Sequence, residues 1–230
     1  MKKNCKGKGL AKGNGCGSLE FIKPLNKGLC SSCWKEWLLS SENGKEYLQK
    51  VSIKAKAIIK HDAKQAKTKG LRKLMSVDAY RAKVLQPVIN EIARLIDFGQ
   101  PCIASGRTKG KMAGGHRKSI GTNRGIALNV HNIHIQSFES NSFRGGDERA
   151  YDAGINREYG NEYLDFLISL ENYTAKFSKS ELEESYKKAC EFRNKLKKDK
   201  KVLSPKDRIN KRNEANEFIG LYDKKESLFG

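Results

Sequence analysis

The chain has 230 residues, with 46 lysines and arginines against 26 aspartates and glutamates, so its formal net charge is +20. This length allows one or two domains, and a hydrophobic content of 37% allows only a lean core. No run of about 18 apolar residues is present, which excludes a membrane-spanning helix. The charge favours a polyanionic partner, nucleic acid before others, with a solubilising surface or an anionic membrane face as the alternatives.

The amino terminus carries a clear pattern of cysteines. Residues 1–6 are basic but no apolar stretch follows them, so we expect no secretory signal and a reducing, cytoplasmic location. Four of the six cysteines lie in the first 33 residues, at Cys5, Cys16, Cys30 and Cys33. Clustered thiols in such a location favour a metal site, and the Cys30-x-x-Cys33 spacing lets both thiolates bind one tetrahedral Zn²⁺. We predict a zinc-ribbon-like head over residues 1–43, with free buried thiols as the alternative because the Cys5 to Cys16 spacing is unusual.

A basic helical arm is predicted over residues 44–98. Between Gly44 and Leu74 there are ten lysines and arginines against two carboxylates, while apolar residues recur at helical spacing. We expect one packed apolar stripe and a positive remainder that lies along a phosphate backbone, with an ordinary solvated helix as the alternative. A second apolar-periodic segment follows the N-cap candidate Ser76, and Pro87 within it predicts a kink or a break.

The centre of the chain is rich in glycine and free of acidic residues. Between Gly99 and Phe138 there is no aspartate or glutamate, and the glycines favour short strands and loops over helices. Alternation of polar and apolar residues over 132–135 predicts a strand with Asn132 and His134 on one face. Such a composition suits a surface that faces phosphates. The expected DNA contacts are Arg107, Lys109, Lys111, Arg117, Lys118, Arg124 and, further along, Arg144.

Four segments of this centre follow one another in the order of a known family. They read PCIASG at 101–106, AGGH at 113–116, LNVHNIHIQS at 128–137 and SNSFRGG at 140–146. From Cys5 to about Leu170 the chain thereby resembles the NinG (Rap) recombination proteins of lambdoid and related phages, a family that resembles HNH, or ββα-metal, endonucleases. The resemblance implies an α+β protein with an HNH-like core over 99–150.

The resemblance also implies roles for single residues. His116 is the expected general base, with a pKa suited to neutral pH. Asn132 is expected to hold the histidine-bearing loop or to orient the imidazole. Asn141 is expected to supply an oxygen to a catalytic Mg²⁺ or Mn²⁺, and His134 is an additional candidate ligand.

The chain departs from the family pattern at a second zinc knuckle. Where the family has paired cysteines, this chain has Cys102-x-x-Ser105 and Ser137-x-x-Ser140. A hydroxyl is a poor Zn²⁺ ligand beside a thiolate, so we expect this zinc site to be lost. Hydrogen bonds are expected to hold the hairpin instead, together with apolar contacts from Ile103, Ile133 and Phe138.

The acidic metal ligand expected near the general base is also missing. Gly115 stands directly before His116, and Ala113 stands three residues before it. The nearest carboxylates downstream of Asn141 are Asp147 and Glu148, which are available to the same ion.

The C-terminal region, 151–230, is predicted to be helical. Apolar periodicity predicts helices over 161–170, 179–198 and 205–222. Ser178, followed three residues later by Glu181, has the pattern of a capping box. Residues 202–230 are so highly charged that we expect only partial order there.

Three functions agree with this sequence. The first is a structure-directed endonuclease of phage recombination, which by resemblance acts on Holliday junctions or D-loops in the host cytoplasm. The second is a non-catalytic junction-binding protein with a degenerate HNH core. The third is a zinc-ribbon RNA-binding or transcription accessory protein. The expected partner is branched DNA and not a membrane, with a phage recombinase and a second copy of the chain as further candidates.

Overall fold

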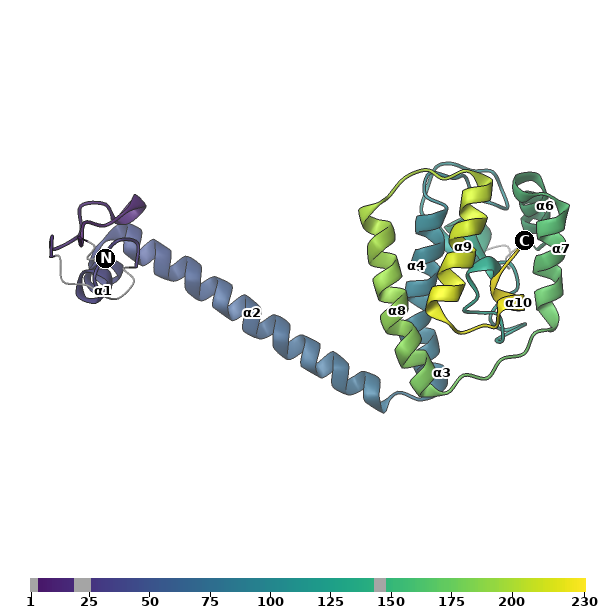
Figure 1. Ribbon diagram of the computed structural model, residues 1–230, viewed down its shortest axis with the longest axis horizontal. Helices are drawn as coiled ribbons and strands as arrows, with labels where there is room; N and C mark the ends of the chain where they lie inside the picture. Colours follow the sequence, from purple (N-terminus) through teal and green to yellow (C-terminus); the bar gives the residue numbers. More distant parts are fainter. Residues whose placement is uncertain (1–3, 19–25, 143–147) are drawn as a thin grey trace. The chain divides into compact units, whose positions relative to one another are not determined.

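The computed structural model describes residues 4–18, 26–142 and 148–230. They divide into two compact units, Met1–Leu71 and Arg72–Gly230. The described chain is mostly helical and contains a two-stranded sheet in the second unit (Figure 1). The predicted basic arm over 44–98 is shared between the two units, because the boundary falls in the last turn of helix α2 (Glu42–Leu74). None of the described helices is long and apolar enough to cross a membrane.

The first unit has a small core built on cysteines and aromatic rings. Helix α1 (Ser31–Ser40) begins directly after Cys30 and buries Trp37, which is 2% exposed. The rings of Trp34 and Trp37 stack with centroids 5.1 Å apart, and Tyr47 of α2 meets Trp34 edge-on at 5.6 Å. These contacts pack α1 against the start of α2.

Helix α2 leaves its apolar stripe uncovered. Every residue from Leu48 to Leu71 is exposed, Ile58 at 61% and Ile59 at 69%. The helix predicted over this segment is present, but the expectation that one stripe packs is wrong for the described part of the chain.

The second apolar-periodic segment is a helix with a wide turn inside it. Helix α3 (Val77–Tyr80) continues into a π-helical turn (Arg81–Leu85) and then into α4 (Gln86–Ile96). Ser76 caps the start, since its side chain accepts a hydrogen bond from the Ala79 amide at 3.2 Å. Proline lacks an amide proton, and the π turn directly before Pro87 absorbs the lost helical bond without ending the helix.

The sheet is a two-stranded antiparallel ladder with helices on both faces. Strand β1 (Met112–His116) pairs with β2 (Ile133–Ser137), and α5 (Phe138–Ser142) follows β2 directly. Helix α4 covers one face so closely that a Cβ on Gly114 would lie 2.7 Å from the Asn90 carbonyl oxygen. On the other face, the Tyr151 hydroxyl lies 3.1 Å from His134 Nδ1.

The C-terminal region is helical, as predicted. Its helices are α6 (Glu148–Tyr159), α7 (Asn161–Ser169), α8 (Lys179–Lys198), α9 (Pro205–Ile219) and α10 (Lys224–Ser227). Helices α4, α8 and α9 pack together, and α6 packs on α7 (Figure 1). The capping box is confirmed: Ser178 and Glu181 each accept a hydrogen bond from the other's amide.

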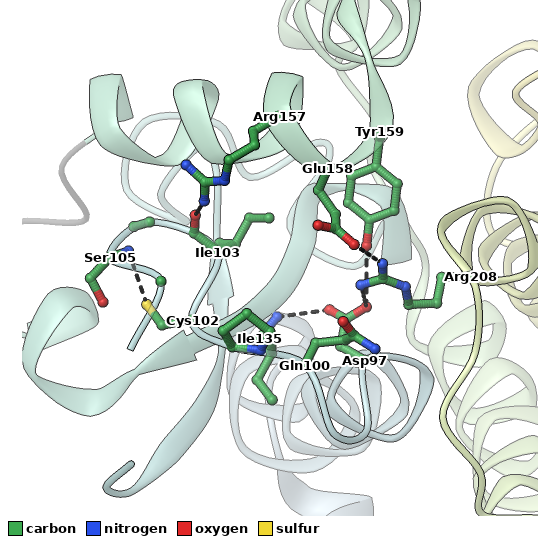
Figure 2. Close-up of a pocket in the computed structure, with 13 residues that line it drawn as sticks. Asp97, Gln100, Cys102, Ile103, Ser105, Ile135, Arg157, Glu158, Tyr159 and Arg208 are labelled. Atoms are coloured by element: carbon green, nitrogen blue, oxygen red, sulfur yellow. Dashed lines mark hydrogen bonds and ion pairs between the residues drawn. The ribbon is translucent and has the colours of Figure 1, made fainter. Parts of the chain in front are cut away.

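The charged C-terminal segment is packed into the unit, contrary to the expected partial order. Arg212 of α9 is fully buried, and its Nη2 lies 2.8 Å from both carboxylate oxygens of Asp97. Asp97 also accepts from the Ile135 amide at 2.8 Å and faces Tyr159, as Figure 2 shows. A buried carboxylate therefore joins α4, β2, α6 and α9, and its arginine partner explains why a highly charged helix is buried.

Candidate functional site

The four N-terminal cysteines converge. The sulfur atoms of Cys5, Cys16, Cys30 and Cys33 all lie within 4.8 Å of one another, and those of Cys16 and Cys30 are 4.0 Å apart. Four thiolates at about 2.3 Å from a tetrahedral Zn²⁺ have their sulfurs about 3.8 Å apart. The donor set therefore fits a structural zinc ion, as the sequence predicts.

Local backbone geometry explains how the unusual spacing closes. A Cβ on Gly15 would lie 2.0 Å from the Cys5 carbonyl oxygen, so the loop before Cys16 approaches Cys5 more closely than another residue allows. Cys30 is the N-cap of α1, and its amide donates to Cys5 Sγ at 3.1 Å. Hydrogen bonds from Cys33 lower the pKa of the Cys30 thiol to about 7, which favours the thiolate that binds metal.

The second knuckle is held by hydrogen bonds. Ser137 Oγ lies 3.0 Å from Ser140 Oγ, and Cys102 Sγ lies 3.8 Å from the same hydroxyl. The Ser105 amide donates to Cys102 Sγ at 3.4 Å. These contacts agree with the expectation that hydrogen bonds, and not a second zinc ion, hold the hairpin. Of the apolar contacts expected there, Ile103 and Ile133 are buried, but Phe138 is 46% exposed and is not part of the core.

Three residues from separate segments meet at a depression of about 280 Å³. His116 ends β1, Asn141 lies in α5, and Glu148 begins α6. The rest of the lining comes from the loop after β1. The structure thus brings together two residues predicted for one site and a carboxylate that the sequence offered only as a downstream neighbour.

One ring nitrogen of His116 is engaged, and the other is left to accept a proton. His116 Nε2 lies 3.0 Å from the Ala127 carbonyl oxygen and 3.1 Å from Gln86 Nε2. Both protons of the Gln86 amide already have acceptors, Ala127 O at 2.8 Å and Asn90 Oδ1 at 2.9 Å. The consistent assignment has His116 donating from Nε2 to Ala127, which puts the lone pair on Nδ1. Burial lowers the pKa of the imidazole, so it is neutral at neutral pH.

Asn132 fixes the loop that follows His116. Its Oδ1 accepts from the Lys118 amide at 2.9 Å, and its Nδ2 donates to the Lys118 carbonyl at 3.1 Å. The Arg117 amide donates to the Asn132 carbonyl at 2.8 Å. Of the two roles expected for Asn132, this is the geometry of a loop clamp, whereas Ala127 orients the imidazole.

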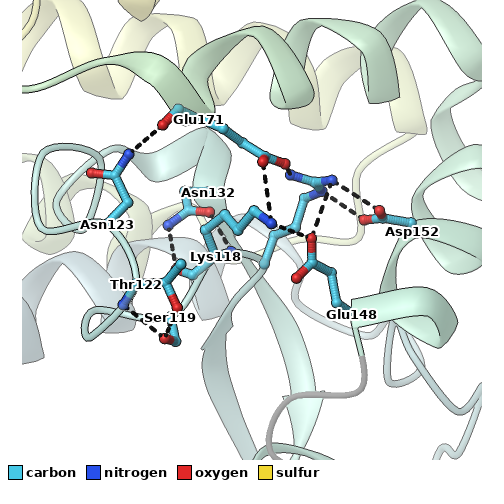
Figure 3. Close-up of polar contacts among 9 residues, drawn as sticks. Lys118, Ser119, Thr122, Asn123, Asn132, Glu148, Asp152 and Glu171 are labelled. Atoms are coloured by element: carbon cyan, nitrogen blue, oxygen red, sulfur yellow. Dashed lines mark hydrogen bonds and ion pairs between the residues drawn. The ribbon is translucent and has the colours of Figure 1, made fainter.

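A network of charges lies beside the depression (Figure 3). Arg117 makes a bidentate pair with Asp152 at 2.6 and 2.8 Å and reaches Glu171 at 2.5 Å. Lys118 Nζ contacts Glu148 and lies 3.1 Å from Glu171 Oε2. Burial opposes ionisation of Glu171, but hydrogen bonds from Arg117 and Lys118 lower its pKa. Since three carboxylates surround two cations, the network is negative overall.

Oxygen atoms suited to a divalent cation face the same depression. Asn141 offers an amide oxygen, and the Glu148 side chain is 48% exposed. Carboxylate and amide oxygens are the ligands that Mg²⁺ and Mn²⁺ prefer. No carboxylate stands immediately before His116, but Glu148 of α6 offers one at the same depression. That carboxylate is paired with Lys118. Asp147 lies outside the described residues.

His134 does not join this group. The register pairs His134 with Gly115, one residue out of phase with His116, so the two imidazoles point to opposite faces of the sheet. His134 is fully buried against Tyr151. The strand predicted over 132–135 begins one residue later than expected, because Asn132 lies in a 3₁₀ turn before β2.

The basic residues predicted to contact DNA fall into two groups. Arg117 is 5% exposed and paired with carboxylates, which leaves little of its guanidinium for a phosphate. Lys118 is also engaged in the network. Arg144 lies outside the described residues. The exposed members are Arg107, Lys109, Lys111 and Arg124.

Sequence reasoning missed the residues that support the site. Gln86 and the Ala127 carbonyl carry no recognisable motif. Asp152 and Glu171 lie 35 and 54 residues after Arg117, so no local pattern links them to it. The centre of the chain contains no acidic residues, so its composition does not indicate that Arg117 has carboxylate partners. Those partners come from the C-terminal region.

Comparison with known proteins identifies the family that the sequence motifs resemble. A family model described as Bacteriophage Lambda NinG protein matches residues 3–202. The matched range contains the cysteine cluster, the His116 depression and helix α8. Comparison with curated proteins and with solved structures gives no match.

Proposed function

Because this chain belongs to the NinG family of bacteriophage proteins, we propose that it is a structure-directed endonuclease that hydrolyses phosphodiesters in branched DNA. Family membership indicates a function related to phage recombination. The step from there to hydrolysis rests on His116, a neutral imidazole whose Nδ1 has no hydrogen-bond partner among the described residues. Asn141 and Glu148 line the same depression.

The residues at and beside the depression have separate roles in the proposed hydrolysis. His116 Nδ1 takes a proton from the attacking water, a contribution of roughly 10²–10⁴-fold to the rate. The Ala127 carbonyl accepts a hydrogen bond from Nε2–H and thereby stabilises the imidazolium that forms. Asn132 keeps the His116 loop in place through Lys118, so it is a positioning residue.

A divalent cation fits the donor set on the other side of the depression. Asn141 and Glu148 would hold it through oxygen atoms, and the network beside them carries more carboxylates than cations. When bound, such an ion stabilises the negative charge that develops on the leaving oxygen.

Exposed cations give the protein its expected affinity for DNA. Lys109 and Lys111 lie directly before β1, the strand that ends at His116. Helix α2 adds exposed lysines, including Lys56, Lys60, Lys64 and Lys67, which recur at helical spacing. Affinity then comes from phosphate contacts and turnover from the depression, so the two can be separated by mutation.

A second candidate function is junction binding without cleavage, and Lys118 favours it. Its ammonium is already paired with Glu148 and Glu171, so the site contains a built-in cation near the place where a metal ion would be needed.

Incubation of an end-labelled synthetic four-way junction with the full-length protein distinguishes the two candidates. We expect strand cleavage that requires added Mg²⁺ or Mn²⁺, and no cleavage of a duplex with the sequence of one arm. Tight junction binding without cleavage in any divalent ion would favour the second candidate.

A further inference from the structure

A second groove combines an apolar floor with basic side chains. It has a volume of about 530 Å³ and lies between the end of α4, the segment that leads into β1 and the end of α8. Pockets that hold small ligands measure roughly 300–1,000 Å³. The apolar lining is Leu95, Phe98, Met112 and Ile135, and the basic lining is Arg94, Lys197 and Lys200. None of these residues lines the His116 depression.

The groove carries unbalanced positive charge. Its one lining carboxylate, Glu91, is paired with Lys197 at 2.7 Å and with Arg193 at 3.5 Å. Arg94 and Lys200 are exposed, and no carboxylate of the described chain lies within ion-pair distance of either. Lys109 and Lys111, both exposed, lie in sequence between the lining residues Thr108 and Met112. The groove therefore attracts an anionic ligand.

The aromatic ring of Phe98 lines the groove beside Lys200. Phe98 is only partly buried, and Lys200 Nζ lies 4.0 Å from its ring centroid. Lys200 is exposed, so its flexible side chain can move off the ring and leave that face to a planar base. The same lysine is then close enough to meet the phosphate of a nucleotide whose base stacks there.

We propose that this groove binds an unpaired segment of DNA, with one base stacked on Phe98 and the flanking phosphates held by Arg94 and Lys200. The proposal rests on the proposed function, because D-loops and other branched DNAs with an unpaired arm contain single strands. Duplex DNA presents phosphates but hides the faces of its bases, so only a single strand uses both the apolar floor and the charged side chains. Charge complementarity favours a nucleic acid over an apolar peptide.

Binding of a short labelled oligo(dT) to the full-length protein tests the proposal, with a hairpin duplex as the comparison. Phe98→Leu keeps an apolar side chain but removes the ring. It should weaken oligo(dT) binding by roughly 5- to 100-fold, the loss expected for one base stack, and leave duplex binding unchanged. The double variant Arg94→Gln/Lys200→Gln should reduce the slope of log K against log salt by about 1.4, because each phosphate contact to a single strand contributes about 0.7. The matched control Lys224→Gln/Lys225→Gln removes the same charge from exposed positions on α10 and should change neither quantity.

A photo-cross-link provides a readout on the unmodified protein. Oligo(dT) that carries 5-iododeoxyuridine should cross-link to the peptide that contains Phe98. Wild-type affinity of a folded Phe98→Leu protein, or a cross-link that maps elsewhere, would overturn the proposal. Tighter binding of oligo(U) with the same loss in Phe98→Leu would assign the groove to RNA and overturn the DNA assignment. Because oligo(dT) binding needs no cleavage, a protein that binds it here but cuts no junction would contradict the proposed function alone.

Discussion

The side chain of Asn132 holds both backbone polar groups of Lys118, accepting from its amide at 2.9 Å and donating to its carbonyl at 3.1 Å. Asn132 stands directly before β2, and Lys118 follows the end of β1. One buried amide therefore fixes the chain two residues after His116, and the position of the imidazole depends on it.

Replacing Asn132 with alanine should affect both stability and cleavage. The part-buried backbone groups of Lys118 lose their partner, so the free energy of unfolding should fall by about 1–3 kcal/mol. Cleavage should slow less than in His116→Ala, because water can replace part of the clamp. Urea unfolding and junction cleavage measure the two effects. The matched control is Asn161→Ala, an exposed asparagine on α7, and equal behaviour of the two variants would contradict the clamp.

The cysteine cluster predicts one zinc ion per chain. Elemental analysis of the purified protein should give one zinc, and Cys30→Ser should lose it, because the sulfur of Cys30 is one of four that converge. Circular dichroism should show that the second unit keeps its helices in this variant. Cys190→Ser, which lies outside the cluster, should keep its zinc. Two zinc ions per chain would mean that the Cys102 knuckle still binds metal, and none would contradict the site.

Local signals in the sequence predict a large part of this structure. Cysteine spacing located the cluster, Ser178 and Glu181 formed the predicted capping box, and glycine content separated the loops of the centre from the helices. Each of these signals acts over a few residues, so the local sequence is enough to predict the structure that it forms.

Relationships between distant segments could not be predicted in the same way. Arg117 looks like a free cation in an acid-free stretch, yet Asp152 and Glu171 from later helices neutralise it. His134 looks like a ligand available on a strand face, yet Tyr151 of the later helix α6 packs against it. Both outcomes are decided by tertiary packing.

The role of Glu148 is tested by removing its charge. Glu148→Gln keeps the shape of the side chain but weakens a cation site, so divalent-dependent cleavage should require a higher ion concentration or disappear. A titration of cleavage rate against Mg²⁺ measures this. Glu139→Gln is the matched control, since Glu139 is also a surface carboxylate paired with a basic residue, Arg107. An unchanged Mg²⁺ dependence in Glu148→Gln would remove this residue from the site.

Two buried histidines predict a loss of stability in mild acid. Burial lowers the pKa of His131 to about 3 and the pKa of His134 well below its ordinary value of 6.5. Below about pH 6.5 the unfolded chain binds protons that the folded chain excludes, so stability falls as pH decreases from there. Each histidine should contribute about 1.4 kcal/mol per pH unit within this window. Urea unfolding between pH 7 and pH 5 measures the slope, and a flat profile would contradict the neutral, buried state of both rings.

The most direct test of the account compares two histidine substitutions in single-turnover cleavage of a four-way junction. His116→Ala removes the proposed general base, and His61→Ala removes an exposed histidine of α2. We predict that His116→Ala slows cleavage by roughly 10²–10⁴-fold while junction affinity stays within a few-fold, and that His61→Ala cleaves like the wild type. Cleavage by His116→Ala at the wild-type rate would contradict the assignment of the active site.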